Sequence, residues 1–179
     1  EKVLATYDKT SLWYQADIAG RRTAATGRIY TGYSYKDVVV MRDYVKDKRF
    51  IAFSIGIDVG GTDATVATLT GFTPQYKEVI LLDGYYHKQG KEHGYTHDQY
   101  AKEIVDKIAE WMETYPSFFI NTHIFCESAD KLFRQALKNE LDRRRINIQV
   151  LPSYKKDGIV DRIRLTNILI NQGRYKIMR

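Results

Sequence analysis

The sequence predicts an α/β fold built on a mixed five-stranded sheet with helices on both faces. Three runs rich in β-branched and aromatic residues, 50–58, 64–70 and 77–86, follow one another with short Gly, Thr and Pro turns between them, which indicates an antiparallel meander. After residue 96 helical and strand-like segments alternate, and such an alternation favours parallel strands joined by right-handed crossovers. We therefore expect three antiparallel strands followed by two parallel ones.

Local start and stop signals define the later elements. Thr96 with Gln99 three residues later forms a capping-box pattern, Pro116 ends the helix that follows, and Gly173 fits a helix C-terminus. The remaining assignments rest on apolar periodicity. We expect helices at 96–115, 129–144 and 157–171, parallel strands at 121–127 and 146–151, and the start of a further strand at 175–178.

Residues 50–179 are expected to form one α/β domain, and residues 1–49 a linker or arm that precedes it. The first 49 residues contain basic loop-like stretches and an aromatic run but no periodicity that predicts a core. No run reaches the ~18 apolar residues of a transmembrane helix, and no signal-peptide pattern opens the chain. The single cysteine, Cys126, excludes an internal disulfide and is typical of a reducing compartment.

Charge is distributed unevenly along the chain, whose net charge is +6. Residues 1–49 carry 10 Lys and Arg against 6 Asp and Glu, residues 50–142 carry 8 against 14, and residues 143–179 carry 10 against 2. A basic C-terminal part beside an acidic middle favours a protein that holds a polyanion near a carboxylate site. An ordinary solvated basic face is the alternative interpretation.

The stretch 50–69, FIAFSIGIDVGGTDATVATL, contains the first candidate for chemistry. Asp58 follows the bulky residues of a buried strand, and Gly60 and Gly61 permit a tight turn. A bare carboxylate buried at such a place costs several kcal/mol unless a cation or hydrogen-bond donors meet it. Asp58 therefore caps the turn, holds a divalent metal or belongs to a phosphate-binding loop, and this stretch alone leaves the three open.

Glu127, at the end of the expected strand 121–127, is the second acidic candidate. In the expected sheet this strand lies beside strand 50–58, so Asp58 and Glu127 project from neighbouring strand ends into one crevice. Two adjacent carboxylates repel each other, and a bridging Mg²⁺ or Mn²⁺ removes that conflict. Two such ions, about 3.5–4 Å apart, activate water and stabilise the leaving oxygen in phosphodiester cleavage.

This layout of a central-strand Asp and a fourth-strand Glu resembles that of the RNase H-like nucleases. The stretches IGIDVGGTDATVATL, VILLDGYY, HIFCESADK, LPSYKKDGIVDRI and NQGRYKI are similar to the C-terminal nuclease domain of the large terminase subunits of tailed bacteriophages, Bacillus siphophages among them. The resemblance covers residues 50–179. Residues 1–49, with GRIY at 27–30, look like the segment that joins a motor domain to the nuclease. The resemblance implies a metal-dependent endonuclease that cuts concatemeric double-stranded DNA during packaging.

The resemblance implies that Asp58 and Glu127 are catalytic metal ligands and that two Mg²⁺ or Mn²⁺ ions are the cofactors. The family's third ligand is an aspartate in a helix after the GRYKI-like hairpin, which we expect beyond Arg179. Asp161 is the nearest substitute within this sequence. It lies four residues after Asp157, so both share one face of the expected helix.

Basic residues of the C-terminal part are candidates for contacts with DNA phosphates. They are Lys155, Lys156, Arg162, Arg164 and Arg174. Surface solvation is the alternative for all five, and Arg162 or Arg164 can instead pair with Asp161. The salt dependence of DNA binding distinguishes phosphate contacts from solvated charges.

Other acidic and histidine residues are weaker candidates. Asp130, close after Glu127, is expected to act as the N-terminal charge of a helix. Asp63 and Asp83 have still weaker claims as ligands. His93 and His97 are four residues apart but lack further ligands for zinc.

The alternative function is a non-catalytic module that docks DNA or the portal. A DVGGT motif also occurs in actin-like kinases and ATPases, but this sequence has one Gly-Gly pair and no complete P-loop, so we expect no ATP hydrolysis by this chain alone.

The implied partners are double-stranded DNA, an upstream motor domain, the terminase small subunit and the portal, with no membrane. The implied location is the host-cell cytoplasm, for a phage-encoded protein that is not part of the virion structure.

Overall fold

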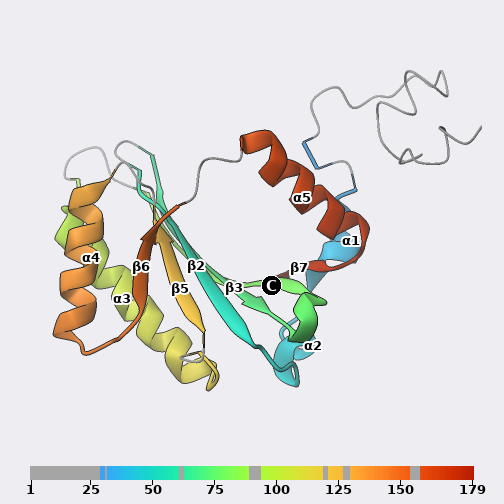
Figure 1. Ribbon diagram of the computed structural model, residues 1–179, viewed down its shortest axis with the longest axis horizontal. Coiled ribbons are helices and arrows are strands. Elements are labelled where there is room, and N and C mark those ends of the chain that lie inside the picture. Colours follow the sequence, from blue (N-terminus) through green and yellow to red (C-terminus); the bar gives the residue numbers. More distant parts are fainter. Residues whose placement is uncertain are drawn as a thin grey trace, which may run out of the picture.

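The structure is a computed structural model that describes residues 29–30, 32–60, 63–88, 94–118, 121–126, 130–153 and 158–179. Its centre is a seven-stranded mixed sheet in the order β1-β7-β4-β3-β2-β5-β6 (Figure 1). The strands are β1 (Val39–Val40), β2 (Ala52–Asp58), β3 (Thr65–Phe72), β4 (Val79–His87), β5 (Thr122–Cys126), β6 (Gln149–Pro152) and β7 (Tyr175–Met178).

The helices are α1 (Tyr35–Val38), α2 (Asp43–Lys46), α3 (His97–Thr114), α4 (Lys131–Arg143) and α5 (Ile159–Asn171), with a 3₁₀ turn at Pro74–Tyr76. Three of the helices, α3, α4 and α5, begin and end close to the positions that the sequence predicts, whereas the short helices α1 and α2 lie in the segment expected to be a linker. The capping box at the start of α3 is confirmed, because the Thr96 and Gln99 side chains bond reciprocally to each other's backbone N–H. None of the helices in the described ranges is long and apolar enough to cross a membrane.

The mixed α/β class with an RNase H-like sheet is confirmed, but the sheet has seven strands instead of the expected five. β2, β3 and β4 form the antiparallel meander, and β5 and β6 continue from β2 in parallel. The two additional strands extend the other edge, where β7 pairs in parallel with β4, and β1 with β7. Unpaired backbone groups on the outer edge of β4 need partners, which β7 supplies, and β1 in turn covers the outer edge of β7.

One face of the sheet forms the core with α3 and α4. Burial alternates along β2, where Phe53, Ile55 and Ile57 are buried and belong to the same apolar cluster as Ile104 of α3 and Leu137 of α4. This period of two matches a strand with one face toward a helical layer. The alternation of apolar residues in 50–57 therefore indicates which face of β2 packs against the helices α3 and α4.

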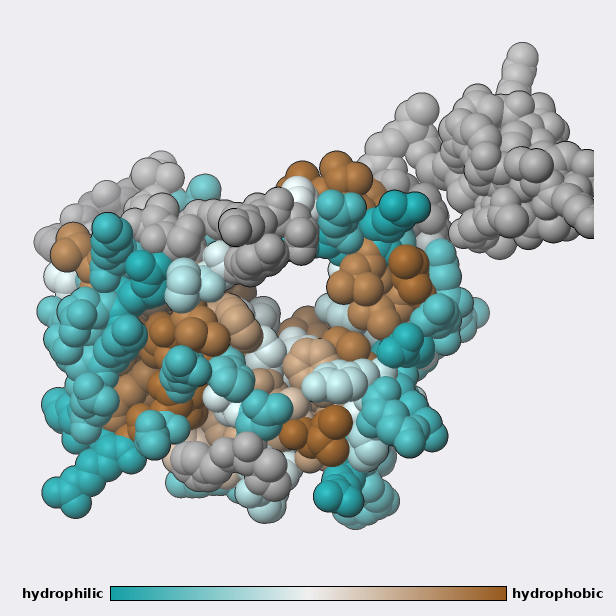
Figure 2. All heavy atoms as spheres, in the orientation of Figure 1, coloured by the Kyte–Doolittle hydropathy of each residue, from teal (hydrophilic) through white to brown (hydrophobic). Residues whose placement is uncertain are grey.

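α5 covers the other face only in part. It connects β6 to β7, and the right-handed rule for parallel crossovers puts it on the side opposite α3 and α4, as Figure 1 shows. Ile170 is its one buried residue, whereas Leu165 is 59% exposed and Ile168 is 44% exposed. An opening separates α5 from the sheet in the space-filling view (Figure 2). Helices therefore lie on both faces, as expected.

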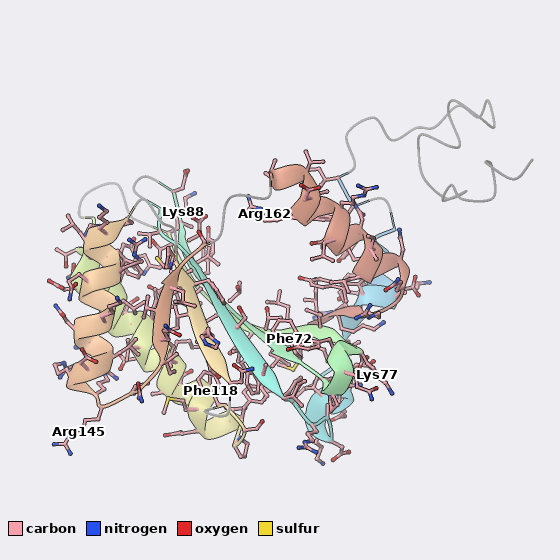
Figure 3. All side chains as sticks on the ribbon, in the orientation of Figure 1. Phe72, Lys77, Lys88, Phe118, Arg145 and Arg162 are labelled. Atoms are coloured by element: carbon pink, nitrogen blue, oxygen red, sulfur yellow. The ribbon has the colours of Figure 1, made fainter. Side chains whose placement is uncertain are left out.

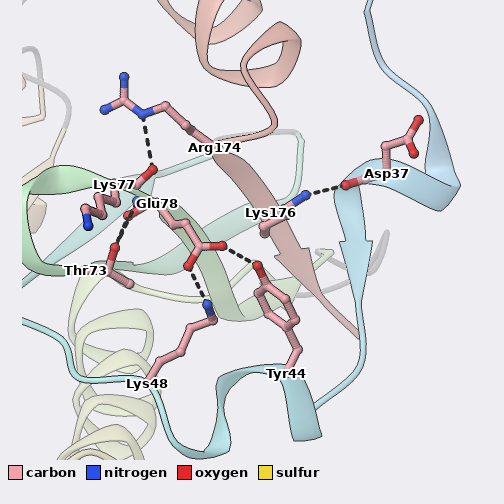
Figure 4. A network of polar contacts seen from close by, with 8 residues as sticks. All are labelled: Asp37, Tyr44, Lys48, Thr73, Lys77, Glu78, Arg174 and Lys176. Carbon is pink, nitrogen blue, oxygen red and sulfur yellow. Dashed lines mark hydrogen bonds and ion pairs between the residues drawn. The ribbon is translucent and has the colours of Figure 1, made fainter.

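The described part of the expected linker is attached to the edge of the sheet by polar contacts (Figure 4). Glu78 accepts hydrogen bonds from Tyr44 and Lys48, and Lys176 of β7 donates to the Asp37 carbonyl oxygen at 2.6 Å. Burial raises the pKa of Glu78, but the bonds from Lys48 and Tyr44 outweigh burial and hold that pKa below its ordinary value. The division into a linker at 1–49 and a nuclease domain at 50–179 stays a prediction.

Candidate metal centre

Asp58 is the last residue of β2, and its side chain is exposed. Its backbone pairs with Val66 of β3, and the preceding residue, Ile57, pairs with Cys126, the last residue of β5. β2 and β5 therefore end side by side at one edge of the sheet, where open α/β folds bind ligands. Among the residues that the structure describes, Asp58 has no ion-pair partner.

The turn after Asp58 is held by contacts within itself. A Cβ atom on Gly60 would lie 2.3 Å from the Asp63 carbonyl oxygen and 2.7 Å from that of Ala64, so this position requires glycine. The Gly60 N–H donates to Oγ1 of the buried Thr65 at 3.3 Å. Because this N–H already has a protein acceptor, the geometry argues against a role for Gly60 in binding phosphate.

Glu127 follows β5 directly in the sequence but lies outside the described residues. Up to that point the strand is well paired, since Cys126 lies opposite Pro152 of β6 and its carbonyl oxygen accepts the Ser153 N–H at 2.7 Å. Asp58 and the end of β5 are thus adjacent in register. A divalent ion shared by Asp58 and Glu127 stays a prediction.

Asp161 lies in the first turn of α5 with an exposed side chain. Its backbone N–H donates to the Gly158 carbonyl oxygen at 3.0 Å, and within the described ranges no ion pair joins it to Arg162 or Arg164. No group of three or more His, Cys, Asp or Glu residues in the described part of the chain is arranged to hold a metal ion. The role of Asp161 as third ligand stays a prediction.

Two of the five predicted DNA-contacting residues are exposed on α5, and two lie outside the described residues. Arg162 and Arg164 come from the first half of the helix and are both exposed. Figure 3 shows Arg162 on α5 and Lys88, which follows β4, at the end of the sheet where β2 and β5 finish. Lys155 and Lys156 are the two that are not described. Their contacts with DNA all stay predictions.

Arg174, the fifth predicted residue, has protein partners at the other end of α5. Its guanidinium donates to the carbonyl oxygens of Tyr76 and Lys77 and to the side-chain oxygen of Gln172. These bonds join the start of β7 to the turn that precedes β4. Arg174 therefore holds two parts of the fold together, and most of the length of α5 separates it from Arg162.

Asp130 carries a charge at the N-terminus of α4, as the sequence predicts, and the structure shows in addition that it is the N-cap residue. One of its carboxylate oxygens accepts the Phe133 N–H at 2.8 Å, and the other lies 3.5 Å from Nε2 of His97. The second oxygen therefore links the starts of α3 and α4. Asp63 is exposed in the turn after β2, and His93 lies outside the described residues.

A row of polar contacts between β4 and α3 was not anticipated from the sequence. Asp83 accepts from Nε1 of Trp111 at 2.8 Å and lies 3.1 Å from Nζ of Lys107. Two residues further along the strand, the Tyr85 hydroxyl donates to Glu103 at 2.6 Å. A register shift in the β3–β4 ladder between Leu69 and Thr70 precedes this row along β4, and such a bulge turns later side chains to the other face.

The spacing of the row was visible in the sequence. Asp83, Tyr85 and His87 recur every two residues and Glu103 and Lys107 are four apart, as one face of a strand and one of a helix require. Burial raises the pKa of Asp83, but bonds from Trp111, Gly84 and Lys107 outweigh burial and hold it below its ordinary value. These charges are committed to the fold, so Asp83 is not a free metal ligand.

No protein-family model matches this sequence, and no curated protein sequence matches it either. Solved structures do match its fold. The large terminase of a thermophilic bacteriophage, in complex with ADP, superposes with a TM-score of 0.64 at 18% identity, over 99% of this chain and 39% of that one. This chain thus spans about two fifths of the length of that thermophilic-phage terminase.

Two further matches are to isolated nuclease domains. The nuclease domain of the P22 large terminase has a TM-score of 0.58 at 10% identity, over 88% of this chain and 75% of that one. The human cytomegalovirus terminase nuclease domain has a TM-score of 0.59 at 10% identity, over 74% and 67%. The chain has the fold of a terminase nuclease domain.

Proposed function

We propose that this chain is the metal-dependent endodeoxyribonuclease of a DNA-packaging terminase. In this proposal it cuts concatemeric double-stranded DNA by two-metal phosphodiester hydrolysis, with Asp58, Glu127 and Asp161 as ligands. The observation that carries it is the parallel register of β2 and β5, in which Ile57 lies opposite Cys126. Each of these residues is followed directly by an acidic one, Asp58 and Glu127.

The chemistry of Asp58 fits a hard divalent ion. Its carboxylate is exposed at the strand edge and has no ion-pair partner among the described residues, and carboxylate oxygens are the ligands that Mg²⁺ and Mn²⁺ prefer. When bound, such ions supply the Lewis acidity that activates water and offsets charge on the leaving oxygen. A manganese-soaked form of the cytomegalovirus domain, which has a TM-score of 0.58 to this chain, supports the choice of ion.

The wider setting is proposed on the same basis. The thermophilic-phage terminase is more than twice as long as this chain, which supports a motor domain upstream, and the terminase small subunit and the portal as further partners. Arg162 and Arg164, with Lys155 and Lys156, are the proposed contacts with DNA phosphates. The proposed location is the host-cell cytoplasm.

A plasmid-cleavage assay tests the proposal. Supercoiled plasmid is incubated with the protein in Mg²⁺, in Mn²⁺ or in EDTA, and nicked and linear products are measured. We expect cleavage with either ion and none in EDTA. Asp58→Asn is expected to reduce the rate by about 100-fold or more, since it removes a charged ligand of the metal.

Asp142→Asn is the matched control, because Asp142 is exposed on α4, and we expect it to cut at the rate of the unchanged protein. Both variants are checked for folding by circular dichroism. If Asp58→Asn retains full activity, the metal assignment is wrong. If DNA binds but is not cut with any metal, the non-catalytic docking module is the better description.

A further inference from the structure

A cavity lies at the end of the sheet opposite Asp58. It has a volume of about 560 Å³ and is bounded by α2, by the last turn of α3 and by Met178 of β7. Figure 1 shows α2 and the end of α3 together at this end, where β2 begins. Cavities of about 300–1,000 Å³ are typical of small-molecule sites, and nothing in the proposed cleavage reaction uses this one.

One wall of the cavity is apolar and aromatic. Trp111 and Phe50 are buried there, and Tyr115 is half-buried with its ring edge-on to Phe50 at a centroid distance of 6.0 Å. Burial, and after it the negative charge of Asp83, raise the pKa of the Tyr115 hydroxyl, while Arg42 opposes them. Arg42 and Asp83 therefore both act on the same phenol at the cavity wall.

Two of the cations that line the cavity have no counter-ions among the described residues. Arg42 and Lys46 line the cavity, are exposed and form no ion pair within the described ranges. Lys48 is held by Glu78, and Asp83 by Lys107. Asp43 offsets one of the two free charges, so the charge available to a ligand is positive.

A smaller cavity of about 260 Å³ adjoins the first and extends it toward the other face of the sheet. The two share Arg42, Asp83 and Met178, and the second adds Arg179. Arg179 has no ion-pair partner in the described part of the chain. The combined site thus joins apolar and aromatic lining residues to the cations Arg42, Lys46 and Arg179.

We propose that this site binds a nucleoside phosphate, with the phosphate at Arg42 and Lys46 and the base against Tyr115 and Met178. Guanidinium groups bind phosphate through paired, charge-assisted hydrogen bonds, and the apolar wall accommodates a planar ring. The ligand comes either from free nucleotide or from the phosphorylated end of a DNA strand. Because α2 belongs to the segment that precedes β2, bound ligand bridges that segment to α3.

The test follows the Trp111 indole N–H and the backbone amides of residues 42–48 by NMR in the ¹⁵N-labelled protein, with EDTA present. Three probes are titrated separately: AMP, a 5′-phosphorylated trinucleotide, and an acidic peptide. We expect AMP or the trinucleotide to shift these signals in a saturable way, and the stronger binder identifies the source of the ligand. The double variant Arg42→Ala/Lys46→Ala is expected to bind about tenfold or more weakly, since two charged hydrogen-bond donors are lost.

The matched control is Lys102→Ala/Lys138→Ala, which removes two exposed charges from α3 and α4 and is expected to bind with unchanged affinity. Three outcomes overturn the proposal: no shift at millimolar nucleotide, equal loss in both double variants, or shifts produced by the acidic peptide alone. The titration is repeated with Asp58→Asn, in which we expect binding without cleavage. Failure of this inference is therefore separable from failure of the proposed nuclease function.

Discussion

At the scale of single residues, the position of Asp58 depends on Gly60, because the turn after β2 has no room for a side chain there. A Cβ atom at Gly60 would come within 2.3 Å of the Asp63 carbonyl oxygen, and real contacts of this kind do not occur, so the turn must move. Gly60→Ala is expected to lower the free energy of unfolding by about 1–3 kcal/mol and to reduce cleavage further than that loss explains.

The control for this change is Gly84→Ala. A Cβ atom at Gly84 would lie 3.4 Å from the Ala67 carbonyl oxygen, an ordinary contact, and Gly84 is exposed in β4. Chemical denaturation gives the stability of both variants, and the plasmid assay gives their activity below the unfolding transition. Equal effects of the two substitutions would contradict a special role for the turn after β2.

Asp83 is the second residue whose neighbours make a firm prediction. Asp83→Ala leaves the Trp111 N–H and the Lys107 ammonium without the carboxylate that now accepts from them. Lost partners of this kind cost about 1–3 kcal/mol, and we expect the lower end because Asp83 and Lys107 are both partly exposed to solvent. Urea denaturation measures the change; Asp142→Ala, on an exposed site of α4, is expected to stay within about 0.5 kcal/mol.

At the scale of elements, Glu78 joins the segment before β2 to the start of β4 (Figure 4). Its pKa in the folded protein is below the ordinary value of 4.5, so the folded state favours the ionised form. The resulting stabilisation is complete above the unfolded-state pKa and is lost as pH falls through the lower, folded-state pKa. Stability therefore depends on this contact at neutral pH and not in strong acid.

The corresponding experiment compares the unchanged protein with Glu78→Gln across pH. We expect Glu78→Gln to be less stable at about pH 7 and the difference to shrink as the pH falls below about 4. Hydrogen exchange of residues 35–48 is expected to rise in the variant at neutral pH. A stability difference that stays constant with pH would show that the lost contact does not involve the charge of Glu78.

The elements that the sequence predicts correctly are those with signals inside a few residues. The capping box of Thr96 and Gln99, the alternation along β2 and the positive φ of 68° at Gly173 after α5 are of this kind. The place of β1 in the sheet is different, because its partner β7 lies near the other end of the sequence. The β3–β4 register shift depends on how two neighbouring strands pair and not on a pattern within either strand. The polar contacts of Asp83 with Trp111 and Lys107 depend on that shift, so a pattern within either strand does not predict them.

The candidate metal centre divides in the same way. The end of β2 at Asp58 and its neighbour β5 were predictable, since both strands carry strong apolar runs and parallel strands of one sheet end at one edge. The position of Asp161, the proposed third ligand, was not predictable, because it sits on a helix whose position over the sheet is set by the pairing of β7 with β4. No local pattern in 157–171 encodes that pairing.

At the scale of the whole molecule, the uneven charge makes a prediction about DNA. Residues 143–179 carry ten basic and two acidic residues, and Arg162 and Arg164 are exposed on α5, the helix that lies beside the opening seen in Figure 2. Each phosphate contact adds about 0.9 to the slope of log affinity against log salt concentration. If both arginines contact phosphates, Arg162→Ala/Arg164→Ala reduces that slope by about 2.

Fluorescence anisotropy with a short DNA duplex, in EDTA and over a range of salt concentrations, measures this slope. The control Lys102→Ala/Lys138→Ala removes the same charge from the helices on the other face of the sheet and is expected to leave the slope almost unchanged. A general effect of net charge would lower both slopes equally and would remove α5 from the DNA interface. A loss confined to the arginine pair would place the duplex on the face of the sheet that carries α5. The metal proposed at Asp58 would then have to be presented toward that face.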